Sequence, residues 1–420
     1  MQVTSLEQAH DALHNYYSLA KKQNGDDSAL SRMLPLLEAA GNPHERLKVV
    51  HVAGTSGKTS TCYYLSALLC SSGKKVGLTV SPYVDTILER IQLDGLPISE
   101  AEFCDKLSEF LSLIKNIDPT PGYFEVMVAF ALWFFDRVGV DYVVLETGIG
   151  GMYDSTNVIN RNDKICVITD IGMDHMQILG NTIEKIAAQK AGIIQRHNDV
   201  FMYRQSDEVM SVIHARVSAQ RARLYECTEF VGDELSKTAL YQQRNWHLSM
   251  QVYEYIASRD HLHVQTALKP EDVSIPGRMQ EVTLPDDTLL IYDGAHNAQK
   301  MKAFVESFQA KFPGQMADVL VAFKDDKAYE EVLAVLKPIT TKLYATNLDH
   351  EQGSHKSGYQ VASMSVDEIV QTARYLAIPV EGFSSYTDAF SQLLKSPQKY
   401  KIVTGSLYLL GLVRELKEHA

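Results

Sequence analysis

The segment Gly54-Thr55-Ser56-Gly57-Lys58-Thr59 has the residue types and the spacing of a loop that binds phosphate. Glycines let backbone N–H groups surround an anion, and a lysine at the end of such a loop can reach the outer phosphates of a nucleotide. The loop follows an apolar run that ends at Val52 and precedes a helical pattern, which is the context that the motif requires. It is a variant, because Val52 stands where the general motif has a glycine. A chance match is the alternative, and the flanking strand and helix argue against it.

Polar residues also follow several other apolar runs. The run 141–146 ends in the carboxylate of Glu146, and glycines at 148, 150 and 151 come directly after it. A carboxylate at the C-terminal end of a parallel strand can reach a Mg²⁺ ion that bridges ATP phosphates, whereas the alternative is a solvated glutamate before a turn. An ordinary polar turn or a solvated surface is likewise the alternative for the remaining candidates, which are 168–175, Lys190, 292–297 and 404–406.

The elements that must position these residues alternate between short β-branched runs and amphipathic helices. This alternation predicts a mainly parallel sheet covered by helices on both faces. The first forty residues predict helices, and residues 197–275 are less regular and predict a peripheral subdomain or irregular β elements. The expected strands are 49–52, 76–80, 142–145 and 165–169, and the expected helices are 59–71, 100–114, 125–138 and 182–194.

A second α/β series begins after a break in periodicity at 274–278. We therefore predict an α/β fold with a P-loop-containing, mainly parallel-sheet ATPase domain at 1–275 and a smaller Rossmann-like α/β domain at 276–420. Two such domains leave a cleft between them. The strands expected in the second series are 289–292, 319–323, 342–346 and 401–404, and the helices are 299–312, 329–336 and 407–417.

Composition narrows the class of protein. The 420 residues are 45% apolar and 22% charged, which is the mixture of a packed globular chain. A formal net charge of −12 argues against partners such as nucleic acid or an anionic membrane surface. Five cysteines without C-x-x-C spacing indicate reduced thiols and no Cys-based zinc site. Because no signal-peptide core and no run of about 18 apolar residues is found, we expect a cytoplasmic protein without a membrane segment.

Taken in order, the motifs resemble the folylpolyglutamate synthase and dihydrofolate synthase family, a branch of the ATP-dependent Mur ligase superfamily. The resemblance runs from about Met33 to Leu410. It is carried by 51–58, Ser81-Pro82-Tyr83, Glu89-Arg90-Ile91, 146–151, 154–158, 172–175, 179–182, 189–193, 293–297 and 404–408.

The resemblance implies an amide ligase with Mg²⁺ as cofactor, ATP and L-glutamate as substrates, and a reduced folate or dihydropteroate as acceptor. An acyl phosphate would form on the acceptor carboxylate, and glutamate would then displace phosphate. We expect a monomer. By the resemblance Ser81, Glu146 and His175 bind magnesium, and Lys58, Lys190 and His296 are the catalytic residues, with Lys190 at the position that the family carbamylates. The implied ATP-binding residues are Gly54, Thr55, Ser56, Gly57, Lys58, Thr59, Ser60, Asn245, Arg278, Asp293 and Ser406.

Departures from the family pattern keep two alternatives open. Thr59 and Ser60 directly follow the loop lysine, as in the cell-wall Mur ligases, and Met152 and Tyr153 replace the usual Arg and Leu. The first alternative is therefore a Mur-type amino-acid ligase that acts on a non-folate carboxylate. The second is a regulatory or nucleic-acid-stimulated P-loop ATPase, against which the negative net charge argues.

Overall fold

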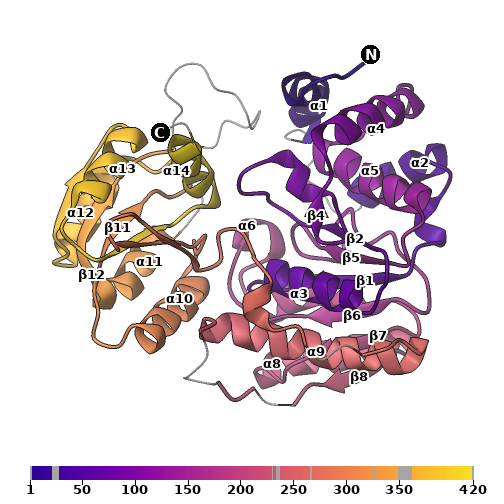
Figure 1. Ribbon diagram of the computed structural model, residues 1–420. Helices are drawn as coiled ribbons and strands as arrows, with labels where there is room; N and C mark the ends of the chain where they lie inside the picture. The colour runs from indigo at the N-terminus through magenta and orange to yellow at the C-terminus, as the bar shows by residue number, and fades with distance from the viewer. Residues whose placement is uncertain are drawn as a thin grey trace.

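A computed structural model of the chain describes residues 2–20, 28–228, 230–232, 237–264, 267–325, 328–348 and 362–418. Within these residues the strands form two sheets, one of eight strands and one of six. The two sheets belong to two bodies that lie side by side, the first coloured indigo to pink and the second orange to yellow (Figure 1). The predicted α/β fold is confirmed.

The larger sheet has the order β4-β3-β2-β5-β1-β6-β7-β8. Strands β2, β5, β1, β6, β7 and β8 are parallel, while the short β3 and β4 pair antiparallel. The central strand β1 lies between β5 and β6, so the chain order reverses beside it, and ligands of open α/β sheets bind at such a point. The strand bounds are β1 Val49–Ala53, β2 Val76–Thr79, β3 Gln92–Leu93, β4 Leu96–Pro97, β5 Tyr142–Glu146, β6 Ile165–Ile168, β7 Asp199–Met202 and β8 Arg223–Glu226.

Helices cover both faces of this sheet. Successive side chains along a strand point to opposite faces, and the buried strands carry apolar side chains on both. Val49 packs with the N-terminal helices and α5, whereas Val50 packs with α3 and α9 on the opposite face. Helices α7 and α8 extend the first of these layers over β6 and β7. The helix bounds are α1 Leu6–Ala20, α2 Ser28–Ala39, α3 Lys58–Ser71, α4 Glu100–Leu113, α5 Tyr123–Val138, α6 Met176–Leu179, α7 Ile183–Ala191, α8 Asp207–Gln220 and α9 Leu240–Asp260.

The smaller sheet has the order β13-β12-β11-β14-β10-β9, with β9 antiparallel to β10 and the other pairs parallel. Helices α10 to α12 pack on one face, and α13 and α14 pack on the other. The bounds are β9 Gln280–Thr283, β10 Leu289–Tyr292, α10 Ala298–Lys311, β11 Ala317–Val321, α11 Tyr329–Leu336, β12 Thr340–Ala345, α12 Val366–Tyr375, β13 Val380–Gly382, α13 Tyr386–Lys395, β14 Tyr400–Thr404 and α14 Leu407–Glu418.

The expectation of an irregular subdomain at 197–275 is wrong. This region supplies β7, α8, β8 and the 21-residue helix α9, which continue the α/β alternation of the first domain. Its pattern is hard to recognise because the buried face of α9 starts with Gln242, Gln243 and Asn245 and becomes apolar only from Leu248 onward. Asn245 lines the candidate site, whereas the side chains of Gln242 and Gln243 are hydrogen-bonded to the Tyr64 hydroxyl and to the carbonyls of Arg278 and Thr238.

The helices expected in the first forty residues are confirmed as α1 and α2, with residues 21–27 outside the described part. No helix in the described ranges is long and apolar enough to cross a membrane. The described part of the chain also contains four short 3₁₀ helices, at Pro43–Glu45, Ile87–Arg90, Pro270–Asp272 and Lys337–Ile339.

Candidate active site

The predicted phosphate loop connects β1 to α3 at the switch point of the large sheet. Two of its glycines are required by close contacts. A Cβ at Gly54 would lie 1.8 Å from Oγ1 of Thr169, and a Cβ at Gly57 would lie 2.6 Å from Oδ1 of Asn245. Gly57 also has φ +89, a left-handed conformation that side chains disfavour. The loop can therefore bring its backbone close to neighbouring groups only with glycine at these two positions.

The loop after β6 holds the phosphate loop in place. The backbone N–H of Thr55 donates to the carbonyl of Asp170 at 2.8 Å, and the Thr55 hydroxyl donates to the carbonyl of Gly172 at 3.0 Å. Asn245 on α9 is buried beside Gly57, as its contact with a Cβ there shows. The conformation of the loop is thus fixed from two sides before a ligand binds.

Two ammonium groups meet at one carbonyl oxygen of this loop. Nζ of Lys58 donates to the carbonyl of Gly54 at 3.0 Å, and Nζ of Lys190 on α7 donates to the same oxygen at 2.9 Å. Burial, followed by the charge of Lys58, lowers the pKa of Lys190 well below its ordinary value. A neutral amine is therefore accessible at Lys190 at a pH where a surface lysine is fully protonated.

Glu146 is the last residue of β5 and is almost completely buried. Its carboxylate accepts from the Thr59 hydroxyl at 2.9 Å and from the Ser81 backbone N–H at 3.1 Å. Burial raises the pKa of Glu146, although the nearby Lys58 ammonium opposes this effect. A buried carboxylate beside hydroxyl oxygens is the hard oxygen donor set that suits Mg²⁺, which keeps several waters and needs only one or two carboxylates.

His175 reaches the same region from a different loop. It precedes α6 with φ +51, and its Nε2 lies 4.0 Å from Oδ1 of Asp174. Among the described residues, no group of three or more His, Cys, Asp or Glu side chains is arranged to hold a metal ion. The residues present therefore fit a magnesium ion that takes most of its ligands from water and phosphate, and they do not fit an all-protein metal cage.

The second domain contributes residues from the segment before β9 and from the C-terminal ends of β10 and β14. Nη2 of Arg278 donates to the Thr59 hydroxyl across the cleft at 3.3 Å. Nδ1 of His296 lies 2.9 Å from the Gly294 carbonyl, so this nitrogen carries the proton and Nε2 accepts a hydrogen bond. Ser406 lies directly before α14 and accepts from the backbone N–H of Tyr408 at 3.2 Å.

Asp293 is held firmly by its own domain and by α9. Its carboxylate accepts from the Tyr241 hydroxyl at 2.7 Å and from the backbone N–H groups of Met279 and Ala295, each at 2.8 Å. Burial raises the pKa of Asp293. These bonds tie Tyr241 of α9 to the backbone at Met279, next to Arg278, and at Ala295.

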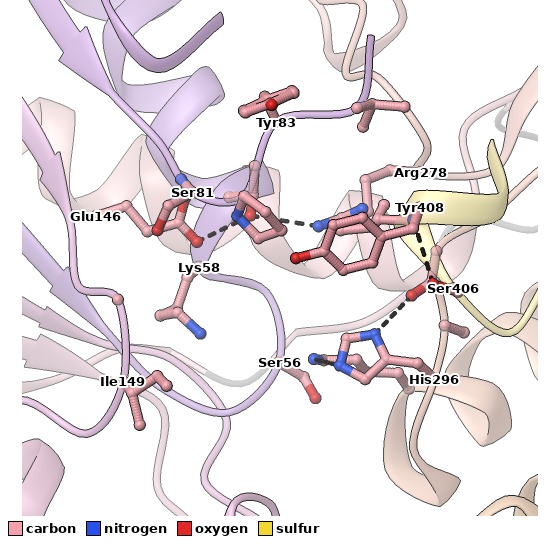
Figure 2. A pocket seen from close by; sticks show the side chains of 18 of the residues that line it. Ser56, Lys58, Ser81, Tyr83, Glu146, Ile149, Arg278, His296, Ser406 and Tyr408 are labelled. Carbon is pink, nitrogen blue, oxygen red and sulfur yellow. Dashed lines mark hydrogen bonds between the residues drawn. The ribbon is translucent and has the colours of Figure 1, made fainter. Parts of the chain in front are cut away.

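All the catalytic, ATP-binding and metal-binding residues predicted from the sequence line a single cavity of about 2230 Å³. In Figure 2, Glu146 and Lys58 lie on one side of the pocket, and Arg278, Ser406 and His296 lie on the other. The cavity thus brings together the phosphate loop, a buried carboxylate and basic side chains from two domains. Their roles in binding and catalysis stay predictions. The lining includes Gly54, Thr55, Ser56, Gly57, Lys58, Thr59, Ser60, Ser81, Glu146, His175, Lys190, Asn245, Arg278, Asp293, His296 and Ser406.

Sequence reasoning missed a basic residue of the cavity, Lys300, and the contacts that cross the cleft. Lys300 lies four residues after His296 on α10, and Nζ of Lys300 lies 3.1 Å from Nε2 of that histidine. Asp174 accepts from the Asn297 amide at 2.9 Å across the cleft. The four-residue spacing, which places two side chains on one helix face, is a signal that could have identified Lys300. The contact with Asp174 depends on the relative position of the domains and leaves no signal in the sequence.

A buried chain of polar groups supports the loop after β5. Nε2 of His51 lies 2.8 Å from the Thr156 hydroxyl, and that hydroxyl donates to Asp154. The other oxygen of Asp154 accepts from the backbone N–H of Ile149 at 2.9 Å. Burial raises the pKa of Asp154 and lowers the pKa of His51 well below its ordinary value. The strand that carries the phosphate loop is thereby linked to the loop that follows Glu146.

Fold and site together define a two-domain α/β protein built around a phosphate-binding loop. Residues 52–272 match the family described as the Mur ligase middle domain, and residues 277–407 match the Mur ligase glutamate ligase domain. Over 431 aligned residues the chain is 30% identical to the dihydrofolate synthase/folylpolyglutamate synthase of Bacillus subtilis, with 93% of this chain and 95% of the relative covered. It is 29% identical to the folylpolyglutamate synthase of Lacticaseibacillus casei, with 96% of each chain covered.

Solved structures agree with these matches. The structure is similar to that of Mycobacterium tuberculosis folylpolyglutamate synthase complexed with ADP, with a TM-score of 0.83, 26% identity and 98% of each chain covered. The chain belongs to the Mur ligases and, within them, to the folylpolyglutamate synthase and dihydrofolate synthase family. The resemblance seen in the sequence is confirmed.

Proposed function

We propose that the protein is an ATP-dependent ligase that joins L-glutamate to the carboxylate of a reduced folate. The observation that carries this proposal is the single cavity in which the phosphate loop, the buried Glu146 and basic residues of the second domain face one another. The relatives named dihydrofolate synthase/folylpolyglutamate synthase support the same reaction, and an ADP complex of one relative supports the use of ATP.

The proposed reaction has two steps. An oxygen of the acceptor carboxylate attacks the γ-phosphorus of ATP, and the bond to the bridging oxygen breaks to release ADP. The amine of glutamate, after losing a proton, then attacks the acyl carbon, and phosphate leaves with one of the acceptor's oxygens. Phosphoryl transfer depends mainly on positioning and charge neutralisation, and Lys58 together with the backbone N–H groups of 54–60 is placed for both.

Mg²⁺ is the cofactor that this donor set fits. Glu146 and Ser81, with the Thr59 hydroxyl, would hold the ion on the strand side, and His175 would approach from the loop before α6. When bound, magnesium neutralises charge on the phosphates and orients them for in-line attack. Replacing Glu146 by Gln should raise the magnesium concentration needed for half-maximal rate by about 10- to 100-fold, because one ligand charge is lost. An unchanged magnesium dependence would return Glu146 to a structural role.

Lys190 is proposed to carry a carbamate. Its lowered pKa favours the neutral amine, which is the form that adds carbon dioxide. Its Nζ donates to the carbonyl of Gly54 and therefore lies at the phosphate loop. The carbamate would replace a positive charge by a negative, oxygen-rich group close to the magnesium ligands. A mass increase of one carbon dioxide plus one CH2 unit on the peptide that contains Lys190, after methylation of the native protein traps the carbamate as its ester, would test the modification directly.

The second domain is proposed to close over the nucleotide. Arg278, His296 and Ser406 would face the phosphates, and Asp293 and Asn245 would contact ATP or fix the backbone that does. An acyl phosphate hydrolyses readily, so domain closure would exclude water from it.

Aromatic residues at the first-domain end of the cavity support a flat acceptor. The Arg90 guanidinium lies over the rings of Tyr83, Tyr123 and Phe124, at 5.6, 5.3 and 5.9 Å from their centres. These residues line the same cavity as the phosphate loop. A pteridine ring can stack on such a surface, so dihydropteroate and reduced folates are both proposed acceptors. The names of the relatives favour these acceptors over the non-folate alternative, and membership of the ligase family argues against a regulatory ATPase.

We further propose that the enzyme acts as a monomer in the cytoplasm. Both sides of the cavity come from one chain, which supports activity without a partner subunit. All five cysteines lie within the described residues and are free thiols, as expected in a reducing compartment.

Product analysis with alternative acceptors tests the proposal. The protein is incubated with ATP, magnesium and labelled L-glutamate, and with tetrahydrofolate monoglutamate, dihydropteroate or a non-folate carboxylate. We expect a glutamylated pteroate or folate and one ADP for each amide formed. Glutamylation of only the non-folate carboxylate would reject the folate acceptor, and ATP hydrolysis that is independent of any acceptor would reject the ligase.

A further inference from the structure

A third lysine reaches the phosphate end of the cavity, and it comes from the second domain. Lys300 lies in the first turn of α10, where its backbone N–H donates to the side chain of the N-cap residue Asn297 at 2.9 Å. Its ammonium lies 3.1 Å from Nε2 of His296 and 3.8 Å from Oδ2 of Asp174, which belongs to the first domain. The side chain is therefore held across the cleft rather than extended into solvent.

The three lysines influence one another electrostatically. Lys58, Lys190 and Lys300 come from α3, α7 and α10, and all three line the same cavity. Burial is the main cause of the lowered pKa of Lys190, and the charges of Lys58 and Lys300 both add to it. The positive charges of Lys58 and Lys300 are unfavourable together in a partly desolvated cavity, and an anion that enters between them relieves the repulsion.

We propose that Lys300 is an additional anion-binding residue that contacts the terminal phosphoryl group of the nucleotide from the second-domain side. Lys58 is the corresponding cation on the first-domain side, because it emerges from the phosphate loop itself. An ammonium group has three donors, so Lys300 can keep its contact with His296 while it donates to a phosphate oxygen. Asp174 and Asn297 orient it, since the Asn297 amide donates to the same carboxylate oxygen that Lys300 faces.

The inference rests on the proposed use of ATP but not on the identity of the acceptor. Lys300 belongs to the second domain, so its contact with phosphate is made only when the two domains are close. It should therefore distinguish a nucleotide that has a γ-phosphate from one that lacks it. A lysine that only fastens the domains together by pairing with Asp174 would affect both nucleotides equally.

The test compares the dissociation constants of ADP and AMPPCP, a non-hydrolysable ATP analogue, by calorimetry at one fixed magnesium concentration. We expect Lys300→Met to weaken AMPPCP by about tenfold, as a lost charged hydrogen bond predicts, and to leave ADP within about twofold. Lys300→Arg should keep most of the preference for AMPPCP. Lys302→Met is the matched control, because Lys302 lies on the same helix, is 72% exposed and pairs with Glu306.

The outcomes distinguish a lysine that binds the terminal phosphoryl group from one that only joins the domains. Loss of AMPPCP and ADP binding by the same factor in Lys300→Met, or no change in either, would overturn the inference. Lys300→Gln provides a second variant if the methionine variant melts at a lower temperature than the wild type. Because neither acceptor nor glutamate is present, a selective AMPPCP defect would stand even if the ligase assay showed a different acceptor.

Discussion

The two halves of the cavity are built differently. On the first-domain side, Lys58 and Lys190 share the Gly54 carbonyl, and Glu146 is bonded to Thr59 and Ser81, so these groups position one another. On the second-domain side, His296 and Lys300 contact each other, and the bonds that join this side to the first domain cross the cleft. They include Arg278 to Thr59, Ser56 to Gln299 and Asn297 to Asp174.

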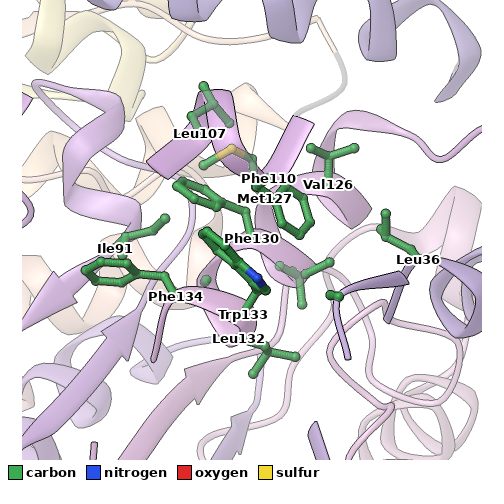
Figure 3. Close-up of a cluster of buried hydrophobic side chains, with 14 of the residues drawn as sticks. Leu36, Ile91, Leu107, Phe110, Val126, Met127, Phe130, Leu132, Trp133 and Phe134 are labelled. Carbon is green, nitrogen blue, oxygen red and sulfur yellow. The ribbon is translucent and has the colours of Figure 1, made fainter. Parts of the chain in front are cut away.

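A large buried core supports the first-domain side of the cavity. Helix α5, which leads into β5 and Glu146, packs its aromatic side chains into a large buried cluster with α4 and α2 (Figure 3). Phe130 lies in contact with Phe103, Phe110 and Trp133 there. Substitutions on the first-domain side should therefore remove chemistry without moving the backbone. Substitutions on the second-domain side should change the fraction of molecules in which the two sides of the cavity are close together.

The largest effect is expected at Lys58. Lys58→Ala removes the loop cation, and the rate should fall by at least about 10²- to 10³-fold, as for the loss of a preorganised charge-stabilising group. The glycines and the backbone bonds of the loop are unchanged, so thermal unfolding should match the wild type. Steady-state rates of amide formation check this, with Lys302→Ala as the control for removing a lysine charge. A folded Lys58→Ala enzyme with near-native turnover would place the nucleotide elsewhere.

Lys190 should be nearly as sensitive if it is carbamylated. Lys190→Ala then loses an oxygen-rich group, and a small carboxylic acid added to the assay should restore part of the rate by occupying its place. Stripping carbon dioxide should inactivate the wild type, and bicarbonate should reactivate it. An unmodified Lys190 in a high-resolution crystal of the active enzyme with ATP and magnesium would contradict the carbamate.

Substitution of Arg278, on the second-domain side, should have a smaller effect on activity than substitution of Lys58 or Lys190. Arg278→Met loses the contact with Thr59 and the charge near the phosphates, so the KM for ATP should rise by about tenfold. The wild type should become more compact on saturation with ATP in small-angle scattering, and the variant should respond less. Full compaction and an unchanged KM in the variant would show that Arg278 does not couple the nucleotide to domain closure.

The smallest effect concerns the stability of the first-domain side. His51 is fully buried, and its pKa lies well below the ordinary value of 6.5 because of burial. The unfolded chain therefore binds a proton that the folded protein does not, and the stability present above pH 6.5 is lost as the pH falls. His51→Gln removes this proton, so its free energy of unfolding should fall less steeply below pH 6.5, by about 1.4 kcal/mol per pH unit. Urea titrations of both proteins between pH 5 and 8 measure the difference, and parallel curves would contradict it.

Much of the first-domain side could be predicted from the sequence because its residues belong to local motifs. Gly54 to Thr59 follow β1, and Glu146 ends the adjacent parallel strand β5; the C-terminal ends of such strands meet at one edge of a sheet. The antiparallel β9 and the helix α9 were not predicted. The first has only four residues, two of them half-buried and two exposed, and the second buries the polar side chains of Gln242, Gln243 and Asn245.

Contacts across the cleft could not be predicted in the same way. The pairing of Asp174 with Asn297 and Lys300 joins residues more than a hundred positions apart. They belong to two domains whose sheets share no described strand. Each residue alone looks like an ordinary polar side chain at a turn or in a first helical turn. Only the arrangement of the two domains shows that they face the same cavity.

The central claim is that the acceptor carboxylate is phosphorylated in this cavity before glutamate attacks. Oxygen-18 in the terminal carboxylate of tetrahydrofolate monoglutamate tests it directly, with inorganic phosphate analysed by mass spectrometry after one round of ligation. We predict one labelled oxygen in each phosphate released with amide product. Amide formation with unlabelled phosphate would contradict the acyl-phosphate route, and with it the proposal that the two sides of the cavity together phosphorylate the acceptor carboxylate.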